Sequence, residues 1–296
     1  MKQYRIFEGI SCAAITPFKK DGSIDFDTFG VLIDRLIAAC PSVTVGGTTG
    51  EASTLTEDEL YELITFAKGR IGNRAVLIAG TGSNCTEAAI RKTKLACRAG
   101  CDAVLVVSPY YNKATPRGLV ESFSEIANAS SVPMIIYNVP ARTGVNVPLS
   151  VYEALSRHPN VFGIKDAAGD VAQTERTVAR LGDSLDVWCG NDELLLPSLA
   201  AGAAGGISVA ANVIPSEMQG VCSLFKGGRL AEALALHSSL LPLIDALFCE
   251  VNPIPVKEAL ALMGIIEPYF RLPLCRAEDT NRERVRRALL GVGLLA

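Results

Sequence analysis

Short apolar runs rich in β-branched residues recur along the chain, and longer segments with helical periodicity lie between them. The runs fall at residues 11–15, 43–46, 75–79, 103–107, 133–137, 161–164, 186–189 and 206–209. Continuous apolar runs of this length are typical of strands buried on both faces, as in a parallel sheet. Their spacing is about thirty residues early in the chain and shorter later. The pattern therefore predicts eight units of one strand and one helix.

The segments between these runs carry start and stop signals for helices. Thr56 precedes an amphipathic segment and is followed three residues later by Glu59, which is the pattern of a capping box. Pro116 and Pro148 occupy predicted first-turn positions, where a missing N–H costs little. Gly100 follows another amphipathic segment, at a place that suits a left-handed residue.

Eight consecutive units favour an α/β fold, a closed (βα)8 TIM barrel. An open, doubly wound sheet would show the same alternation, but the phosphate-binding GxGxxG, GKS and GKT turns typical of that fold are missing from the sequence. After residue 209 the chain contains helical segments only. We therefore expect a catalytic barrel domain over residues 1–228 and a C-terminal helical domain over residues 229–296.

Composition and charge narrow the class of protein. Hydrophobic residues make up 49% and charged residues 20% of the chain, a balance typical of globular proteins. The net charge of -3 provides no field that would attract a polyanion, so we expect no nucleic-acid partner. Residues 1–15 mix charged side chains with short apolar runs and lack the apolar core of a signal peptide. This predicts a cytoplasmic location.

One uncharged segment, residues 194–214, is about long enough to span a membrane. It is interrupted by Pro197, Gly202, Gly205 and Gly206. We interpret it as a helix, a turn and a buried strand, and we expect no membrane association.

Cysteine and histidine usage argues against a metal enzyme. The nine cysteines form no CxxC pair, which indicates reduced, mostly structural thiols. The two histidines, His158 and His237, lie far apart without HxH or HxxxH spacing, so we expect them on the surface or at helix ends. We therefore predict a protein without a metal ion, whose activity survives EDTA.

Candidate catalytic residues follow the predicted strands, because the active sites of barrels lie at the C-terminal ends of their strands. After the second strand, residues 46–51 read GGTTGE, whose glycines, hydroxyls and backbone N–H groups suit a small carboxylate. A strained turn with capping threonines explains the same segment. Tyr137 ends the fifth strand and Arg142 follows shortly after, which offers a phenol for proton transfer and a guanidinium for a carboxylate.

Lys165 ends the sixth predicted strand and is the strongest candidate nucleophile. The period of two places it on the face of Val161 and Gly163, which we expect to be the barrel interior. A lysine there is partly desolvated, so its amine loses a proton more easily and can attack a ketone. Alternatively, Lys165 reaches solvent or pairs with Asp166. The competing lysines fall on polar helix faces, in a loop or at a helix start: Lys68, Lys92, Lys94, Lys113 and Lys257.

Seven ordered segments together carry a resemblance to a known family. They are GGTTGE at 46–51, AGTGSN at 79–84, SPYYN at 108–112, YNVP at 137–140, GIKD at 163–166, GNDE at 190–193 and NPIPVK at 252–257. With these motifs the sequence closely resembles the dihydrodipicolinate synthase family, within the pyruvate-dependent class I aldolase superfamily, almost from end to end.

The resemblance implies a Schiff-base lyase or synthase of lysine and diaminopimelate biosynthesis. Lys165 would form an imine with pyruvate, and the derived enamine would add to L-aspartate 4-semialdehyde. Ring closure by the substrate amine would free the lysine and release 4-hydroxy-tetrahydrodipicolinate. No cofactor or metal would be required, and the family suggests a homotetramer built as a dimer of dimers.

The resemblance also implies roles for individual residues. Proton relay would involve Tyr137, Thr48 and Tyr111, with Tyr111 entering from the adjacent subunit. Thr49 would bind the pyruvate carboxylate, and Arg142 would orient the semialdehyde carboxylate. Gly190 and Ile207 would line the site through their backbone carbonyls. Sialic-acid lyases, similar in their lysine and tyrosine motifs, lack an arginine at the place of Arg142, although a rim salt bridge would also explain that residue.

One departure from the family concerns regulation by lysine. Glu57 and Leu60 stand where lysine-inhibited members have histidines, and Ala88 stands where a glutamate is expected. Asn84 and Tyr110 are retained as a possible allosteric remnant. We therefore expect inhibition by lysine to be weak or absent.

Two other functions remain compatible with the sequence. A related Schiff-base lyase would cleave N-acetylneuraminate or a 2-keto-3-deoxy sugar acid by the reverse of the same enamine chemistry. A sensor would bind pyruvate or a lysine-pathway metabolite without turnover, but a pure binding site does not need the nucleophilic amine of Lys165.

Overall fold

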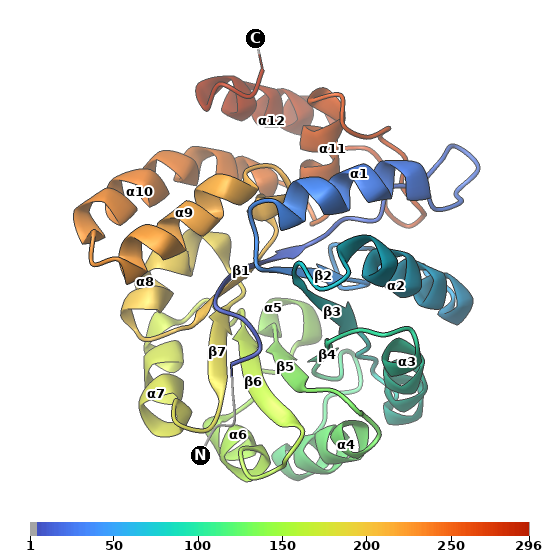
Figure 1. The fold of residues 1–296 in the computed structure, drawn as a ribbon, viewed down its shortest axis with the longest axis vertical. Helices are drawn as coiled ribbons and strands as arrows, with labels where there is room; N and C mark the ends of the chain where they lie inside the picture. The colour runs from blue at the N-terminus through green and yellow to red at the C-terminus, as the bar shows by residue number, and fades with distance from the viewer. Residues whose placement is uncertain (1–4, 296) are drawn as a thin grey trace.

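The computed structural model describes residues 5–295, so residues 1–4 and 296 of the two predicted domains lie outside the described part. Eight parallel strands pair in chain order, and the last pairs with the first, which closes a barrel (Figure 1). The strands are β1 (Gly9–Ala13), β2 (Ser42–Val45), β3 (Val76–Gly80), β4 (Ala103–Val107), β5 (Met134–Asn138), β6 (Val161–Asp166), β7 (Asp186–Cys189) and β8 (Gly205–Ser208). Each strand lies within two residues of a predicted run, and the predicted (βα)8 fold is confirmed.

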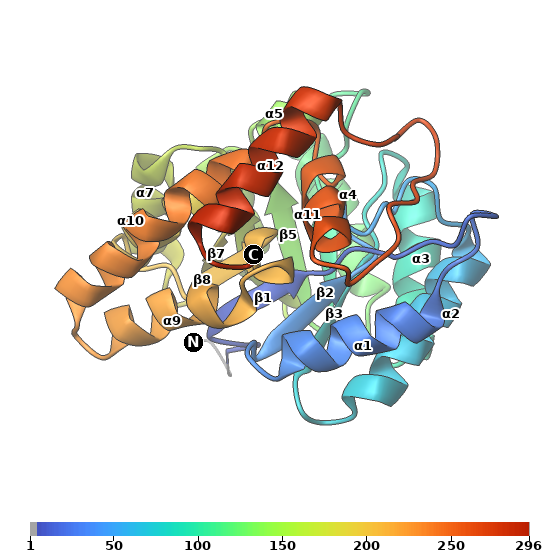
Figure 2. The same ribbon diagram turned by 90° about the horizontal axis from the view of Figure 1, so that it is seen from above.

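Helices surround the barrel, and the chain after the last strand is helical (Figure 1). Those up to β8 are α1 (Phe26–Ile37), α2 (Glu57–Ile71), α3 (Thr86–Arg98), α4 (Pro116–Asn128), α5 (Pro140–Thr143), α6 (Leu149–Leu155), α7 (Val171–Leu181) and α8 (Leu195–Ala200), with the 3-10 turn η1 (Asp192–Leu194) before α8. After β8 come η2 (Ala210–Asn212), α9 (Pro215–Lys226), α10 (Leu230–Leu247), α11 (Ile254–Leu262) and α12 (Asp279–Gly291). The last three helices lie together across one side of the barrel (Figure 2). The domain boundary between residues 228 and 229 stays a prediction.

The local signals act largely as predicted. Thr56 caps α2 and forms the expected capping box with Glu59, and Gly100 follows α3 with a φ of +89°. Pro116 is the first residue of α4, but Pro148 is the N-cap residue of α6 and so precedes its first turn.

The hydrophobic core has two parts, as the alternating strand faces require. Outward-facing strand residues pack against the helices, and inward-facing residues fill the barrel. Phe7 stacks on Trp188 with 4.7 Å between ring centroids, and both rings are buried in the inner part. Phe7 precedes β1 and Trp188 belongs to β7, so this pair helps to fill the barrel interior.

Two side chains lie elsewhere than predicted. Val161 packs in the outer part of the core, while its neighbour Phe162 packs against the inner part. The pairing of β5 with β6 is irregular at this point, since Met134 opposes Val161 and the next residue opposes Gly163. The additional residue breaks the period of two, so the predicted shared face of Val161 and Lys165 is wrong. His237 is buried within α10, where its Nε2 lies 3.1 Å from the Asp192 carbonyl.

The segment 194–214 forms α8, a turn and β8, in agreement with our interpretation. One other helix, α10, is long and apolar enough to cross a membrane, with a mean hydropathy of 1.4. It packs against α9 and α12, and 39% of this 18-residue segment is buried inside the protein. A core helix of a soluble protein meets the same criterion of length and composition.

Gly80 ends β3 directly beneath the turn that follows β2. A Cβ atom there would lie 2.2 Å from the Gly46 carbonyl oxygen, so backbone would have to move. We expect Gly80→Ala to destabilise the protein by roughly 1–3 kcal/mol or more, as overpacking does. Gly69→Ala on α2 is the control, because nothing lies within 4 Å of that site and alanine favours the helix. Urea unfolding of both variants tests this, and equal midpoints would contradict it.

Candidate active site

A cavity of about 190 Å³ lies at the C-terminal ends of the barrel strands. Strand ends and the loops after them supply most of its lining, and the segment between α10 and α11 covers part of it. The polar side chains that line it are Thr44, Thr48, Thr49, Tyr137, Arg142, Lys165, Asn191 and Asn252. Six predicted site residues therefore meet at one cavity, namely Thr48, Thr49, Tyr137, Arg142, Lys165 and Gly190.

Lys165 is placed by the pairing of β6 with β5, which sets it opposite Tyr137. Its side chain is buried, and its Nζ lies 4.3 Å from the centre of the Tyr137 ring. A Cβ atom at Gly190 would lie 3.0 Å from the Lys165 Cε, so the glycine leaves the lysine its space. Among residues 5–295 no carboxylate pairs with this amine. Lys165 is thus a buried primary amine beside a phenol, which suits attack on a carbonyl carbon.

Asp166 does not pair with Lys165, because it points away from the barrel interior. Its carboxylate accepts hydrogen bonds from Asn138 Nδ2 at 3.1 Å, Thr174 Oγ1 at 3.1 Å and the Ala168 N–H at 3.2 Å. Burial raises the pKa of Asp166, and these hydrogen bonds oppose the shift. The carboxylate fixes the loops after β5 and β6 and leaves the amine free.

The turn after β2 presents Thr48 and Thr49 to the cavity. Thr49 is buried, and its Oγ1 accepts a hydrogen bond of 3.0 Å from Asn252 Nδ2. The Glu51 N–H donates to the Thr48 carbonyl at 3.1 Å, which tightens the turn. Glu51 has a φ of +57°, a left-handed conformation that is uncommon outside glycine. Hydroxyls and backbone of this turn therefore form a compact, polar wall.

Arg142 lies at the rim of the cavity, on the short helix α5. Its Nη2 donates to the Asn252 carbonyl at 3.1 Å, which orients the guanidinium while the side chain stays exposed. The remaining N–H groups can bind a carboxylate through two parallel hydrogen bonds.

Other predicted residues lie apart from this cavity. Ile207 is fully buried in the barrel interior and is not among the lining residues. Tyr111 is 92% exposed with a φ of +70°, and it does not line the cavity of its own chain. The Asn84 carbonyl accepts a hydrogen bond of 2.9 Å from Asn112, and Asn84 does not line the cavity either.

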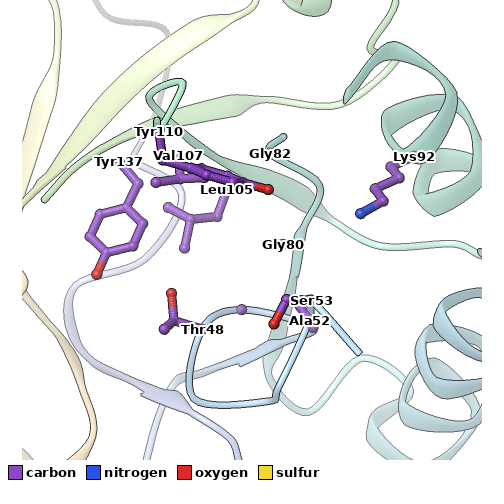
Figure 3. A pocket seen from close by; sticks show the side chains of 12 residues that line it. Thr48, Ala52, Ser53, Gly80, Gly82, Lys92, Leu105, Val107, Tyr110 and Tyr137 are labelled. Atoms are coloured by element: carbon purple, nitrogen blue, oxygen red, sulfur yellow. The ribbon is translucent and has the colours of Figure 1, made fainter. Parts of the chain in front are cut away.

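A second cavity of about 160 Å³ adjoins the first (Figure 3). The two share Gly47, Thr48, Leu105 and Tyr137. Tyr110 lines the second cavity, and Lys92 of α3 faces it from the side opposite Tyr137 (Figure 3). No Asp or Glu of residues 5–295 lines this space, so Lys92 supplies its charge.

Sequence reasoning missed Asn252 and Lys257 as parts of the site architecture. Asn252 bonds both Thr49 and Arg142, and Lys257 is fully buried although we assigned it to a helix start. The motif at 252–257 is visible in the sequence. Its residues contact Thr49 and Glu51, some 200 residues earlier in the chain, and no local pattern predicts such contacts.

The described residues offer no obvious set of metal ligands. Among residues 5–295 no group of three or more His, Cys, Asp or Glu side chains is arranged to hold a metal ion. All nine cysteines are free thiols.

Comparisons with known proteins agree with this geometry. Residues 6–291 match the model of the dihydrodipicolinate synthetase family. A relative from Alkaliphilus oremlandii, named 4-hydroxy-tetrahydrodipicolinate synthase, is 46% identical over 95% of this chain and 97% of its own length. The crystal structure of dihydrodipicolinate synthase from Thermotoga maritima is 39% identical, with a TM-score of 0.96, over 98% of this chain and all of that one. A structure described as the first monomeric dihydrodipicolinate synthase variant has the same identity and TM-score, over 98% of each chain.

Proposed function

This chain belongs to the dihydrodipicolinate synthetase family, and from that premise we propose that its cavity condenses pyruvate with L-aspartate 4-semialdehyde. It is an enzyme, a Schiff-base lyase acting as a 4-hydroxy-tetrahydrodipicolinate synthase in lysine and diaminopimelate biosynthesis. The single observation that carries the mechanism is the buried, unpaired amine of Lys165 beside Tyr137. The relatives favour this activity over cleavage of N-acetylneuraminate or a 2-keto-3-deoxy sugar acid.

The reaction begins with a carbon–nitrogen bond. The neutral Lys165 amine attacks the keto carbon of pyruvate, and loss of water gives the imine. Loss of a methyl proton gives an enamine, whose carbon adds to the aldehyde of the semialdehyde. The amino group of that substrate then attacks the imine carbon, which closes the ring and releases Lys165. One water leaves overall, and no oxidant or metal takes part.

The residues around Lys165 have complementary roles in this proposal. Tyr137 is the nearest phenol to the amine and transfers protons during imine formation, together with Thr48. Thr49 and the N–H groups of its turn bind the pyruvate carboxylate. Arg142 at the rim holds the carboxylate of the second substrate. Gly190 admits the lysine chain, and Ile207 supports the barrel floor beneath it.

We propose that the working enzyme is a homotetramer, a dimer of dimers in which Tyr111 completes the site of a neighbouring subunit. A tyrosine that is 92% exposed in an unfavourable backbone conformation gains from such a contact. We also propose that the enzyme is cytoplasmic, because its free thiols suit that reducing compartment. Sedimentation and the turnover of Tyr111→Phe test the oligomer and the crossing residue.

Trapping with borohydride tests the proposed chemistry. With pyruvate present, reduction should attach one carboxyethyl group to Lys165 and end turnover with both substrates. Borohydride without pyruvate is the control, and tryptic mass spectrometry locates the label. An unlabelled Lys165 would refute the imine, and faster turnover of a sugar acid would refute the substrate pair.

L-Lysine is expected to leave the rate unchanged at micromolar concentrations. L-Lysine carries two ammonium groups and one carboxylate. The second cavity presents the Lys92 ammonium and no carboxylate from residues 5–295, so the ligand's ammonium groups find no counter-charge there. A dose series of L-lysine against the initial rate checks this. A rate halved by micromolar lysine would contradict it.

A further inference from the structure

A fully buried ion pair connects the C-terminal helices to the threonine turn. Lys257 of α11 donates to the Glu51 carboxylate with 2.6 Å between Nζ and Oε1. Both side chains are 0% exposed. Neither residue lines the catalytic cavity, but Glu51 belongs to the turn that carries Thr48 and Thr49.

The surroundings of Lys257 hold its amine in one place. Nζ also donates to the Thr16 carbonyl at 3.1 Å and lies 4.6 Å from the Phe18 ring and 4.7 Å from the Phe270 ring. Burial lowers the pKa of Lys257, and the charge of Glu51 opposes that shift. Burying such a pair gains little stability over an apolar replacement, so its presence calls for another explanation.

The contacts of this pair converge on the turn. Thr16, whose carbonyl Lys257 holds, donates from Oγ1 to the Gly50 carbonyl at 2.7 Å. Glu51 Oε2 accepts from the Arg271 N–H at 3.4 Å. Three segments distant in the sequence therefore fix Gly50 and the left-handed Glu51. Because these two residues close the turn, they set the direction in which the threonines point.

The same C-terminal segment reaches both substrate-binding groups through Asn252. Its side chain donates to Thr49, and its carbonyl accepts from Arg142. Asn252 thus bridges these two groups, and Lys257 anchors the same segment beside the turn.

We propose that Glu51 and Lys257 are positioning residues for pyruvate: their ion pair aligns the threonine turn with the pyruvate carboxylate, and so makes α11 part of the catalytic apparatus. This inference rests on the proposed function. Neither residue touches substrate, and each acts through the hydroxyls and N–H groups of the turn.

The test replaces both charges together, in Glu51→Gln/Lys257→Met. Neutral side chains of similar size leave no unpaired buried charge, so the variant should fold where Lys257→Met alone would strand the carboxylate. We expect the KM for pyruvate to rise at least about tenfold, because a displaced turn misaligns the bound carboxylate. The KM for the semialdehyde should stay within about twofold, since Arg142 keeps its contact with Asn252.

The matched control is Glu258→Gln/Arg276→Met, at the next position of the same helix. Glu258 is also 0% exposed, and its Oε1 lies 2.9 Å from Arg276 Nε. This pair ties α11 to the segment before α12 and makes no contact with the turn. Its pyruvate KM should stay near the wild-type value. A similar rise in both double variants, or an unchanged KM in the first, would overturn the proposal.

Borohydride labelling separates this proposal from the proposed function. The variant should label Lys165 fully, but at pyruvate concentrations about tenfold higher than wild type. No label in the wild type would refute the imine itself, whereas equal concentration dependence would refute only the positioning role. If the double variant does not fold, Glu51→Gln tests the charge of the pair alone. Burial lowers the pKa of Lys257, so without the carboxylate its amine can lose the proton and stay hydrogen-bonded to the amide. The pyruvate KM should then rise in the same direction but by less, and an unchanged KM would overturn the proposal.

Discussion

Lys165→Ala is expected to reduce turnover of pyruvate and semialdehyde by a factor of at least about 10⁴. The methyl side chain cannot form the imine, and no other lysine lines the catalytic cavity among residues 5–295. Without a covalent electron sink, the methyl group of pyruvate stays too weakly acidic to become a carbon nucleophile. Steady-state rates, together with borohydride labelling of the variant, measure the loss.

A lysine outside the cavity provides the control for this loss. Lys113→Ala changes a loop side chain and should retain wild-type turnover, while Lys165→Arg keeps a cation but cannot form the imine and should be as inactive as alanine. Circular dichroism must show both Lys165 variants folded. Turnover of Lys165→Ala within about tenfold of wild type would refute the covalent mechanism.

Tyr137→Phe is expected to lower kcat by about 10²- to 10⁴-fold, the usual contribution of a positioned proton donor. The aromatic ring that packs against Lys165 remains, and only the hydroxyl is lost. Within residues 5–295 that hydroxyl makes no hydrogen bond, so its removal strands no protein partner and the fold should persist. Imine formation should slow, which single-turnover labelling with borohydride resolves.

Tyr152→Phe is the matched control for the loss of a phenol. Tyr152 is 1% exposed, its hydroxyl also lacks a hydrogen-bond partner, and it lies away from the cavity on α6. Its kcat should match the wild type. A Tyr137→Phe enzyme as fast as Tyr152→Phe would exclude proton transfer by this hydroxyl.

Local pattern was enough to predict the barrel and much of the candidate site. Each strand run is short, apolar and buried on both faces, and barrel closure follows from eight such units in order. The position of Lys165 at a strand end followed from the same pattern, because parallel strands of a barrel all end at one rim. Its neighbour Tyr137 follows from the register of β5 with β6.

The remaining features depend on contacts that no local pattern contains. The irregular pairing at Met134 inverts the face of Val161, although both strands read as regular runs. Lys257 follows a proline-rich helix start, yet its charge is buried against a carboxylate 206 residues earlier. Only the folded chain brings these partners together, so sequence reasoning assigned Lys257 to an ordinary helix position.

The stacked rings of Phe7 and Trp188 have a consequence for the order in which the two substrates bind. Together with the other buried residues of the inner core they fill the barrel interior, so we expect substrates to enter at the rim where the strands end. Lys165 lies deeper than Arg142, which is exposed at that rim. We therefore expect pyruvate to bind first, because a semialdehyde held by the Arg142 guanidinium in our proposal would block its way to Lys165. Because the substrates and the product would use the same opening, the cyclic product must leave before the next pyruvate can bind.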